Sequence, residues 1–115
     1  MNIDENGEIQ MSTDEFNEIV KQDTIRALNI KLVQDVKNIT VIYDGIKYDG
    51  DELSQGRMVK ALMIATTETF DWVGSDNIVH NLTHNQLNAI LTLAVAEHSR
   101  LVLECNRLKS EILYE

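Results

Sequence analysis

The sequence predicts a small α+β domain in which three helices alternate with two β-hairpins, in the order αββαββα. Residues that cap helices precede three apolar stretches of helical period. Two pairs of short apolar runs flank turn-forming residues. With 115 residues the chain suits one domain, which we expect over 12–115 after an acidic N-terminal segment at 1–11. We expect a small antiparallel sheet packed on the helices, because isolated hairpins are only marginally stable.

The first helix is predicted from Ser12 to about Lys37. Ser12 can cap it, and Glu15 stands where it closes a capping box. The polar stretch at 21–24 (KQDT) is a candidate break, and Ile30 does not fit the apolar face. That face is predicted to carry Phe16, Ile19, Val20, Leu28, Leu32 and Val36.

The first hairpin is predicted from Asp44-Gly45, which lies between the runs ITVIY and IKY. Asp-Gly in this setting indicates a two-residue type I′ turn, in which both central residues take positive φ. The turn pairs Tyr43 with Ile46, and it places four residues on one apolar face: Val41, Tyr43, Ile46 and Tyr48.

A calcium loop is the functional alternative for the acidic residues near this turn: Asp44, Asp49, Asp51 and Glu52. Their spacing does not follow the twelve-residue EF-hand pattern. Acidic residues beside glycine are typical of turns, so we predict no metal site here.

The short second helix is expected over about 54–69, capped by Ser54, with Asp51 as a competing cap. Threonines weaken its end.

The second hairpin is predicted from runs at 70–73 and 78–82 around the turn formers GSDN. Phe70 and Trp72 share one face, and we expect Trp72 to pack under a helix, with an exposed binding role as the alternative.

The third helix is predicted over about 84–113, after a capping box of Thr83 and Gln86. Apolar residues recur along it at alternating spacings of four and three, which we call the seam. A seam of this kind packs either within the domain, which we favour, or on another chain. Its candidates for protein interaction are Leu91, His98, Leu101, Cys105, Leu108 and Ile112.

Composition argues against several functions. The net charge of −9 opposes direct binding to a nucleic-acid backbone. No apolar run is long enough for a membrane span, and the acidic N-terminus is not a signal peptide. His80, His84 and His98 lack zinc spacing, and Cys105 has no recognisable base beside it. We therefore predict no catalytic, cofactor or metal residues, and a non-enzymatic protein.

A set of short motifs carries a family resemblance: Tyr43-Asp44-Gly45, Tyr48-Asp49, Ser54-Gln55, Trp72, Asp76-Asn77, Leu82-Thr83 and Leu108-Lys109-x-x-Ile112. Over about 25–113 they resemble a small domain of unassigned function found in bacteriophage and prophage tail-fibre and tail-fibre-assembly proteins. The resemblance implies a tail-associated structural or assembly protein that binds other proteins, in the host cytoplasm or the virion. Self-association through the C-terminal helix is one such interaction. Family members often carry the domain on longer chains, whereas here it is nearly the whole sequence, which leaves room for a stand-alone assembly factor.

The charge distribution supports an alternative, a small acidic phage-encoded inhibitor of a host defence or nucleic-acid-processing protein. Six acidic residues precede the first basic residue: Asp4, Glu5, Glu8, Asp14, Glu15 and Glu18. Asp14, Glu15 and Glu18 are its contact candidates. Acidic residues at a helix N-terminus are also favoured by the helix dipole, without any binding role.

Overall fold

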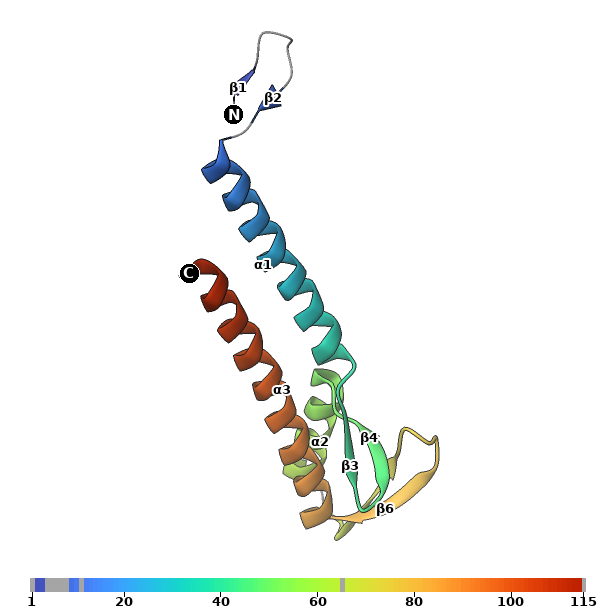
Figure 1. Cartoon of the computed structure of the whole chain (residues 1–115). Helices are drawn as coiled ribbons and strands as arrows, with labels where there is room; N and C mark the ends of the chain where they lie inside the picture. The colour runs from blue at the N-terminus through green and yellow to red at the C-terminus, as the bar shows by residue number, and fades with distance from the viewer. Residues whose placement is uncertain (1, 4–8, 11, 65, 115) are drawn as a thin grey trace.

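The computed structural model describes residues 2–3, 9–10, 12–64 and 66–114, and it has the predicted α+β architecture (Figure 1). A short antiparallel strand pair precedes the first helix. The elements are β1 (Asn2–Ile3), β2 (Ile9–Gln10), α1 (Thr13–Lys37), β3 (Thr40–Tyr43), β4 (Ile46–Asp49), α2 (Glu52–Ile64), β5 (Thr69–Val73), β6 (Val79–Thr83) and α3 (His84–Leu113).

The long helices α1 and α3 lie side by side and antiparallel, so α1 begins and α3 ends at the same end of the molecule (Figure 1). We call α1 together with residues 97–113 of α3 the arm, and residues 39–94 the head. α2 and the two hairpins lie in the head, against the first turns of α3.

Helix α1 begins as predicted, because the Ser12 hydroxyl accepts a hydrogen bond from the backbone N–H of Glu15 at 3.1 Å. The candidate break at 21–24 does not occur, and the helix runs to Lys37 as predicted. The Thr24 hydroxyl instead donates to the Val20 carbonyl, 2.8 Å away and one turn back. This bond satisfies the threonine within a continuous helix.

The first hairpin has the predicted turn and register. Asp44 and Gly45 have φ of 52° and 77°, as a type I′ turn requires. Tyr43 pairs with Ile46 and Val41 pairs with Tyr48. Val41 and Tyr48 are buried and their neighbours on that face are half-buried, which confirms the apolar side of the hairpin.

Helix α2 starts before the predicted position, at Glu52, and ends earlier, at Ile64. The backbone N–H of Gln55 donates to the Asp51 carbonyl at 2.8 Å, so the first turn closes on Asp51, the competing cap. Ser54 lies inside the helix, and its hydroxyl donates to the Asp51 carboxylate, so its assignment as the cap was wrong. The chain beyond the helix enters strand β5 at Thr69.

The second hairpin pairs Phe70 with Leu82 and Trp72 with His80. The hairpins form two separate two-stranded sheets, and not one joined sheet. They meet where the backbone N–H of Ser75 donates to the Lys47 carbonyl at 2.8 Å.

Helix α3 has the predicted capping box. The Thr83 N–H donates to the Gln86 side chain at 2.8 Å, and the Gln86 N–H donates back to the Thr83 hydroxyl at 3.2 Å. The backbone N–H groups at the start of a helix have no partner within the helix. The capping box gives a hydrogen-bond acceptor to two of them, those of Thr83 and Gln86.

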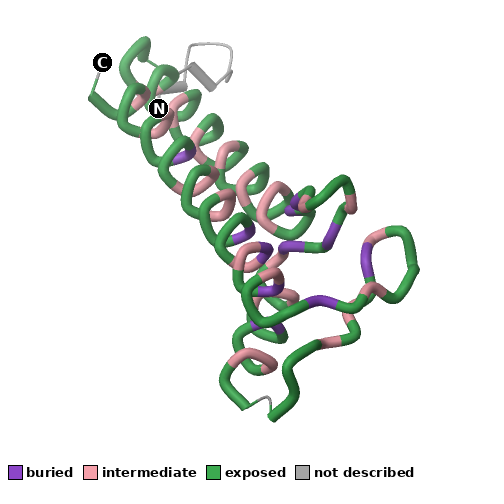
Figure 2. Tube along the Cα trace, turned by 90° about the horizontal axis from the view of Figure 1, so that it is seen from below, coloured by how far each residue is buried: buried purple, intermediate pink, exposed green. Residues whose placement is uncertain are grey.

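The buried core lies in the head (Figure 2). Trp72 and Phe70 pack against it and are half-buried, as expected. In the arm only Cys105 is buried among the described residues, and α1 has no buried residue along its 25 positions. The arm is therefore a single pair of helices with open flanks. The core consists of Ile39, Val41, Tyr48, Met58, Leu82, Leu87, Ile90 and Ala94.

Candidate protein-interaction surfaces

The predicted seam of α3 packs within the molecule. Leu91 and Leu101 are half-buried against the core, and the Cys105 thiol lies 3.7 Å from the Leu28 carbonyl oxygen of α1. Burial of this kind suits an inert structural thiol.

The remaining seam candidates are also partly covered. His98 is half-buried, with Nδ1 3.4 Å from the Gln55 side-chain nitrogen of α2. Leu108 lines a narrow groove between α1 and α3 with Leu28, and Ile112 is half-buried further along α3. The structure thus brings the seam residues to the side of α3 that the rest of the chain covers.

The acidic candidates lie in the first two turns of α1, far from the core. Asp14 and Glu18 are exposed and Glu15 is half-buried. Asp4, Glu5 and Glu8 lie outside the described residues. Asp14 and Glu15 in the first turn complement the positive end of the helix dipole.

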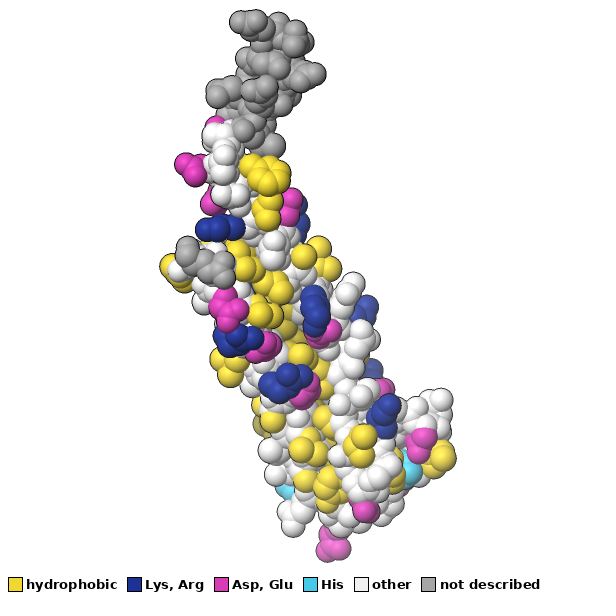
Figure 3. Space-filling view, in the orientation of Figure 1, with side chains coloured by type: hydrophobic (Ala, Val, Ile, Leu, Met, Phe, Trp, Pro, Cys, Tyr) yellow, Lys and Arg dark blue, Asp and Glu magenta, His cyan; other side chains and the backbone are white. Residues whose placement is uncertain are grey.

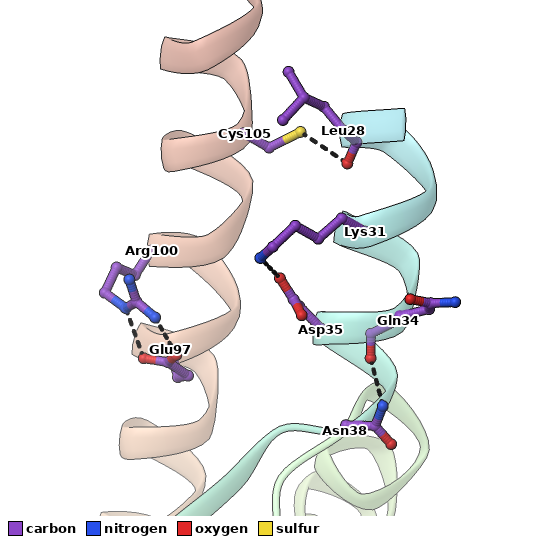
Figure 4. Close-up of polar contacts among 8 residues, drawn as sticks. All are labelled: Leu28, Lys31, Gln34, Asp35, Asn38, Glu97, Arg100 and Cys105. Atoms are coloured by element: carbon purple, nitrogen blue, oxygen red, sulfur yellow. Dashed lines mark hydrogen bonds and ion pairs between the residues drawn. The ribbon is translucent and has the colours of Figure 1, made fainter. Parts of the chain in front are cut away.

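One flank of the arm carries ion pairs, and we call it the charged flank: Lys31, Asp35, Glu97, Arg100, Glu104, Arg107 and Glu111. Glu97 pairs with Arg100 and Glu104 with Arg107, each at 2.6 Å. The guanidinium groups lower the pKa of both glutamates, chiefly through these hydrogen bonds. Figure 4 shows the Glu97–Arg100 and Lys31–Asp35 pairs, and Figure 3 shows basic and acidic side chains interspersed over this face.

The other flank of the arm is mainly apolar, although Lys37, Asp51 and Glu52 also line one of its grooves. Two shallow grooves of about 440 and 420 Å³ meet there and share His98 and Val102. Val95 and Glu104 are nine residues apart, which is two and a half helical turns, so the two flanks lie on opposite sides of α3. We call this surface the apolar flank: Val33, Val36, Leu53, Val95, Val102 and Leu103.

A second apolar surface runs along the side of α1 that faces away from α3. We call it the outer stripe: Phe16, Ile19, Val20, Ala27 and Ile30, all exposed. Leu28, which faces α3, is two residues from Ile30, so the two side chains project in opposite directions.

The single apolar face predicted for α1 is therefore divided in two. Leu28, Leu32 and Val36 are half-buried, whereas Phe16, Ile19 and Val20 are exposed. The misfit of Ile30 was the signal in the sequence for this second face.

The head carries a polar cleft of about 370 Å³ between the hairpins and α2. Trp72, Arg57 and Asp49 are among its lining residues. Beside it, the Asp76 carboxylate accepts from the Ile78 N–H at 3.0 Å and lies 3.0 Å from His80 Nε2. These bonds lower the pKa of Asp76, the Ile78 bond most strongly.

The described part of the chain has no cluster of three or more His, Cys, Asp or Glu side chains that could hold a metal. Within the same residues, no helix combines the length and apolar character needed to cross a bilayer.

These features define a small α+β domain with a two-helix arm and exposed apolar faces. The chain belongs to the DUF4376 family, a domain of unknown function, whose profile matches residues 24–115. The match confirms a domain of unassigned function over the fold from the second half of α1 onward, and the link to tail-fibre proteins stays a prediction. No curated protein and no solved structure matches the chain.

Proposed function

We propose that this chain is a non-enzymatic bacteriophage protein, a tail-associated structural or tail-fibre assembly protein, that acts by binding other proteins. The phage setting rests on the motif resemblance in the sequence. The binding mode rests on one observation: α1 leaves an apolar stripe open along its outer side, with Phe16 55% and Ile30 54% exposed. Host cytoplasm or virion is the corresponding location.

The outer stripe suits a helical partner. Phe16, Val20, Ala27 and Ile30 are separated by four, seven and three residues, which is a heptad spacing. An amphipathic helix that packs along such a stripe covers its apolar side chains. Burial of one Phe or Ile side chain contributes about 1.5–3 kcal/mol, which helps to offset the entropy lost on association.

Affinity purification tests this proposal. The tagged full chain is recovered from cells that produce the phage encoding it, and bound proteins are identified by mass spectrometry. We expect the wild type to retain a tail component, and Ile30→Glu to lose it. Leu93→Glu is the matched control, because Leu93 is also an exposed apolar residue but lies on α3. Failure of the wild type to retain any tail component contradicts the proposal.

The second candidate is the acidic inhibitor of a host protein. The observation that favours it is the position of Asp14 and Glu18, which are both exposed and one helical turn apart near the start of the arm. With Glu15 they give a compact acidic surface that suits a basic partner. Charge reversal of all three residues should abolish binding to such a host protein, and unchanged binding rules out this role for them.

A further inference from the structure

We propose that the polar cleft of the head binds the C-terminal end of an extended, otherwise uncharged peptide segment of another protein. The segment adds to β5 as a parallel strand, and its terminal carboxylate lies at Arg57. This inference concerns the head, and it depends neither on the outer stripe nor on a role in phage tails.

Strand β5 has one open edge. Its single strand neighbour among the described residues is β6. The Gly74 N–H donates to the Ile78 carbonyl at 3.0 Å, so these two residues begin the ladder as a hydrogen-bonded pair. Because such pairs alternate along an antiparallel ladder, the backbone N–H and C=O groups of Asp71 and Val73 point away from β6. In the described part of the chain no backbone hydrogen bond from another segment reaches these groups, and an edge of this kind is a template for a further strand.

The polar cleft lies along this open edge. Five consecutive residues line it, 71–75, whereas side chains on one face of a strand would contribute only every second residue. Helix α2 lines the cleft through Ser54 and Arg57. Its volume of about 370 Å³ falls within the range of about 300–1,000 Å³ that is typical of ligand sites. An extended peptide in the cleft can exchange backbone hydrogen bonds with Asp71 and Val73, which is the mode of binding called strand addition.

The open edge is closed at Gly74. This residue is buried, and a Cβ atom on it would lie 3.2 Å from the Lys47 carbonyl oxygen of β4. The Ser75 N–H donates to the same oxygen at 2.8 Å. A strand that adds to β5 therefore cannot continue past Val73 and has to end there. For this reason the ligand is a chain terminus and not an internal segment.

Charge favours the C-terminus over the N-terminus. Arg57 is exposed and forms no ion pair or hydrogen bond with a described residue, whereas the other three arginines of the chain each pair with an acidic side chain. A guanidinium group binds a carboxylate through two parallel hydrogen bonds, and it repels an ammonium group.

The two carboxylates of the cleft limit what else the ligand carries. Asp49 accepts from the Ser75 hydroxyl at 2.8 Å, and Asp71 accepts from the Asn81 side chain at 3.1 Å. Two carboxylates beside one guanidinium repel a segment that is rich in acidic side chains. The cleft therefore takes a single carboxylate at the end of an uncharged segment.

The probe is a mixture of random N-acetylated hexapeptides with free C-termini, compared with the same mixture in C-terminally amidated form. The full chain is immobilised, and the retained peptides are identified by mass spectrometry. We expect enrichment of peptides from the free mixture only. Calorimetry then gives the dissociation constant of the preferred peptide. Arg57→Gln should raise this constant about tenfold or more, because a charge-assisted pair is lost. Arg26→Gln, at an exposed arginine of α1, is the matched control and should leave it unchanged.

Val73→Pro tests the addition of a strand. The Val73 N–H points to the open edge, so proline removes a donor to the ligand but none of the bonds to β6. Val79→Pro is the matched control, because Val79 pairs with Val73 and its N–H points to the opposite edge of the hairpin. The first change should weaken binding about tenfold or more, and the second should not. Circular dichroism shows whether each variant is folded. If Val73→Pro is not, a backbone N-methylated form of the preferred peptide replaces it and should fail to bind the wild type.

Three outcomes overturn the proposal: no peptide is enriched, the amidated mixture is retained as well as the free one, or binding survives the loss of the backbone donor. Ile30→Glu on the outer stripe should bind the preferred peptide as the wild type does. Loss of a tail component through that stripe and failure of the cleft are thereby distinguished.

Discussion

The Ser75 hydroxyl in the turn of the second hairpin donates to the Asp49 carboxylate at the end of the first, over 2.8 Å. The backbone N–H of Ser75 adds a bond to the Lys47 carbonyl, also 2.8 Å. The two hairpins share no strand pairing, so these contacts hold one sheet against the other.

The Ser75–Asp49 bond should be measurable as a coupling energy. Ser75→Ala and Asp49→Ala each remove it, and the double variant should cost less than the sum of the two single variants by roughly 1 kcal/mol. Urea denaturation of the four proteins gives this difference. Additive costs would show that the side-chain bond contributes nothing to the docking of the hairpins.

The packing around Gly50 is expected to leave no room for even a methyl group. A Cβ atom there would lie 3.0 Å from both the Ala94 and Ile39 side chains. Gly50→Ala should lower the free energy of unfolding by about 1–3 kcal/mol through overpacking. Gly56→Ala is the control, since a Cβ atom there meets open space within α2. It should stabilise the protein by about 0.5–1 kcal/mol, because alanine favours a helix over glycine. Equal effects of the two changes would contradict the packing described around Gly50.

Two methionines of α2 should differ sharply in their contribution to the free energy of unfolding. Met58 is fully buried, whereas Met63 is 78% exposed. Met58→Ala should destabilise the protein by about 2–5 kcal/mol because it leaves a cavity in the head core. Met63→Ala should be near neutral, and chemical denaturation measures both. A large cost at Met63 instead would indicate that this side chain is covered in solution.

Stability should fall on acidification in part through Asp76. Its pKa lies below the ordinary value of 3.8 in the folded chain, because the Ile78 N–H and His80 favour the carboxylate. A lowered folded-state pKa contributes stability above the unfolded value, and this contribution is lost as the pH falls through the folded value. The wild type should therefore be more stable than Asp76→Asn at neutral pH, and the difference should shrink below about pH 4. Thermal unfolding of both proteins across this pH range measures the difference in stability. A difference that stays constant with pH would exclude Asp76 as a source of acid sensitivity.

Local features of the fold were predictable from the sequence because their causes are local. The capping box of Thr83 and Gln86 starts α3 where expected, and Asp44-Gly45 sets the hairpin register. The start of α2 was misplaced because Asp51 and Ser54 both suit a cap, and the hydrogen bond from Gln55 to the Asp51 carbonyl decides between them.

The surfaces of the arm depend on how each helix is rotated against its neighbour, which no local pattern determines. The heptad spacing of α3 identified residues such as Leu101 and Cys105, but it did not say that α1 covers them. Phe16 and Ile19 were assigned to the same apolar face as Leu28, but Ile19 is nine residues from Leu28 and so lies on the opposite side of α1, and both Phe16 and Ile19 are exposed. Which apolar residues remain exposed follows from the pairing of α1 with α3, which is a tertiary contact.

The antiparallel arm also determines how the molecule responds to tension. Since α1 begins and α3 ends at the same pole, a force that pulls these two points apart acts across the contact between the helices and not along it. The helices then unzip one turn at a time from that pole, and each step breaks only the few contacts of one layer. The load reaches Cys105 before it reaches the head, where Leu87 and Ile90 are fully buried. A chain held at both ends would thus lengthen at low force while its head stays folded.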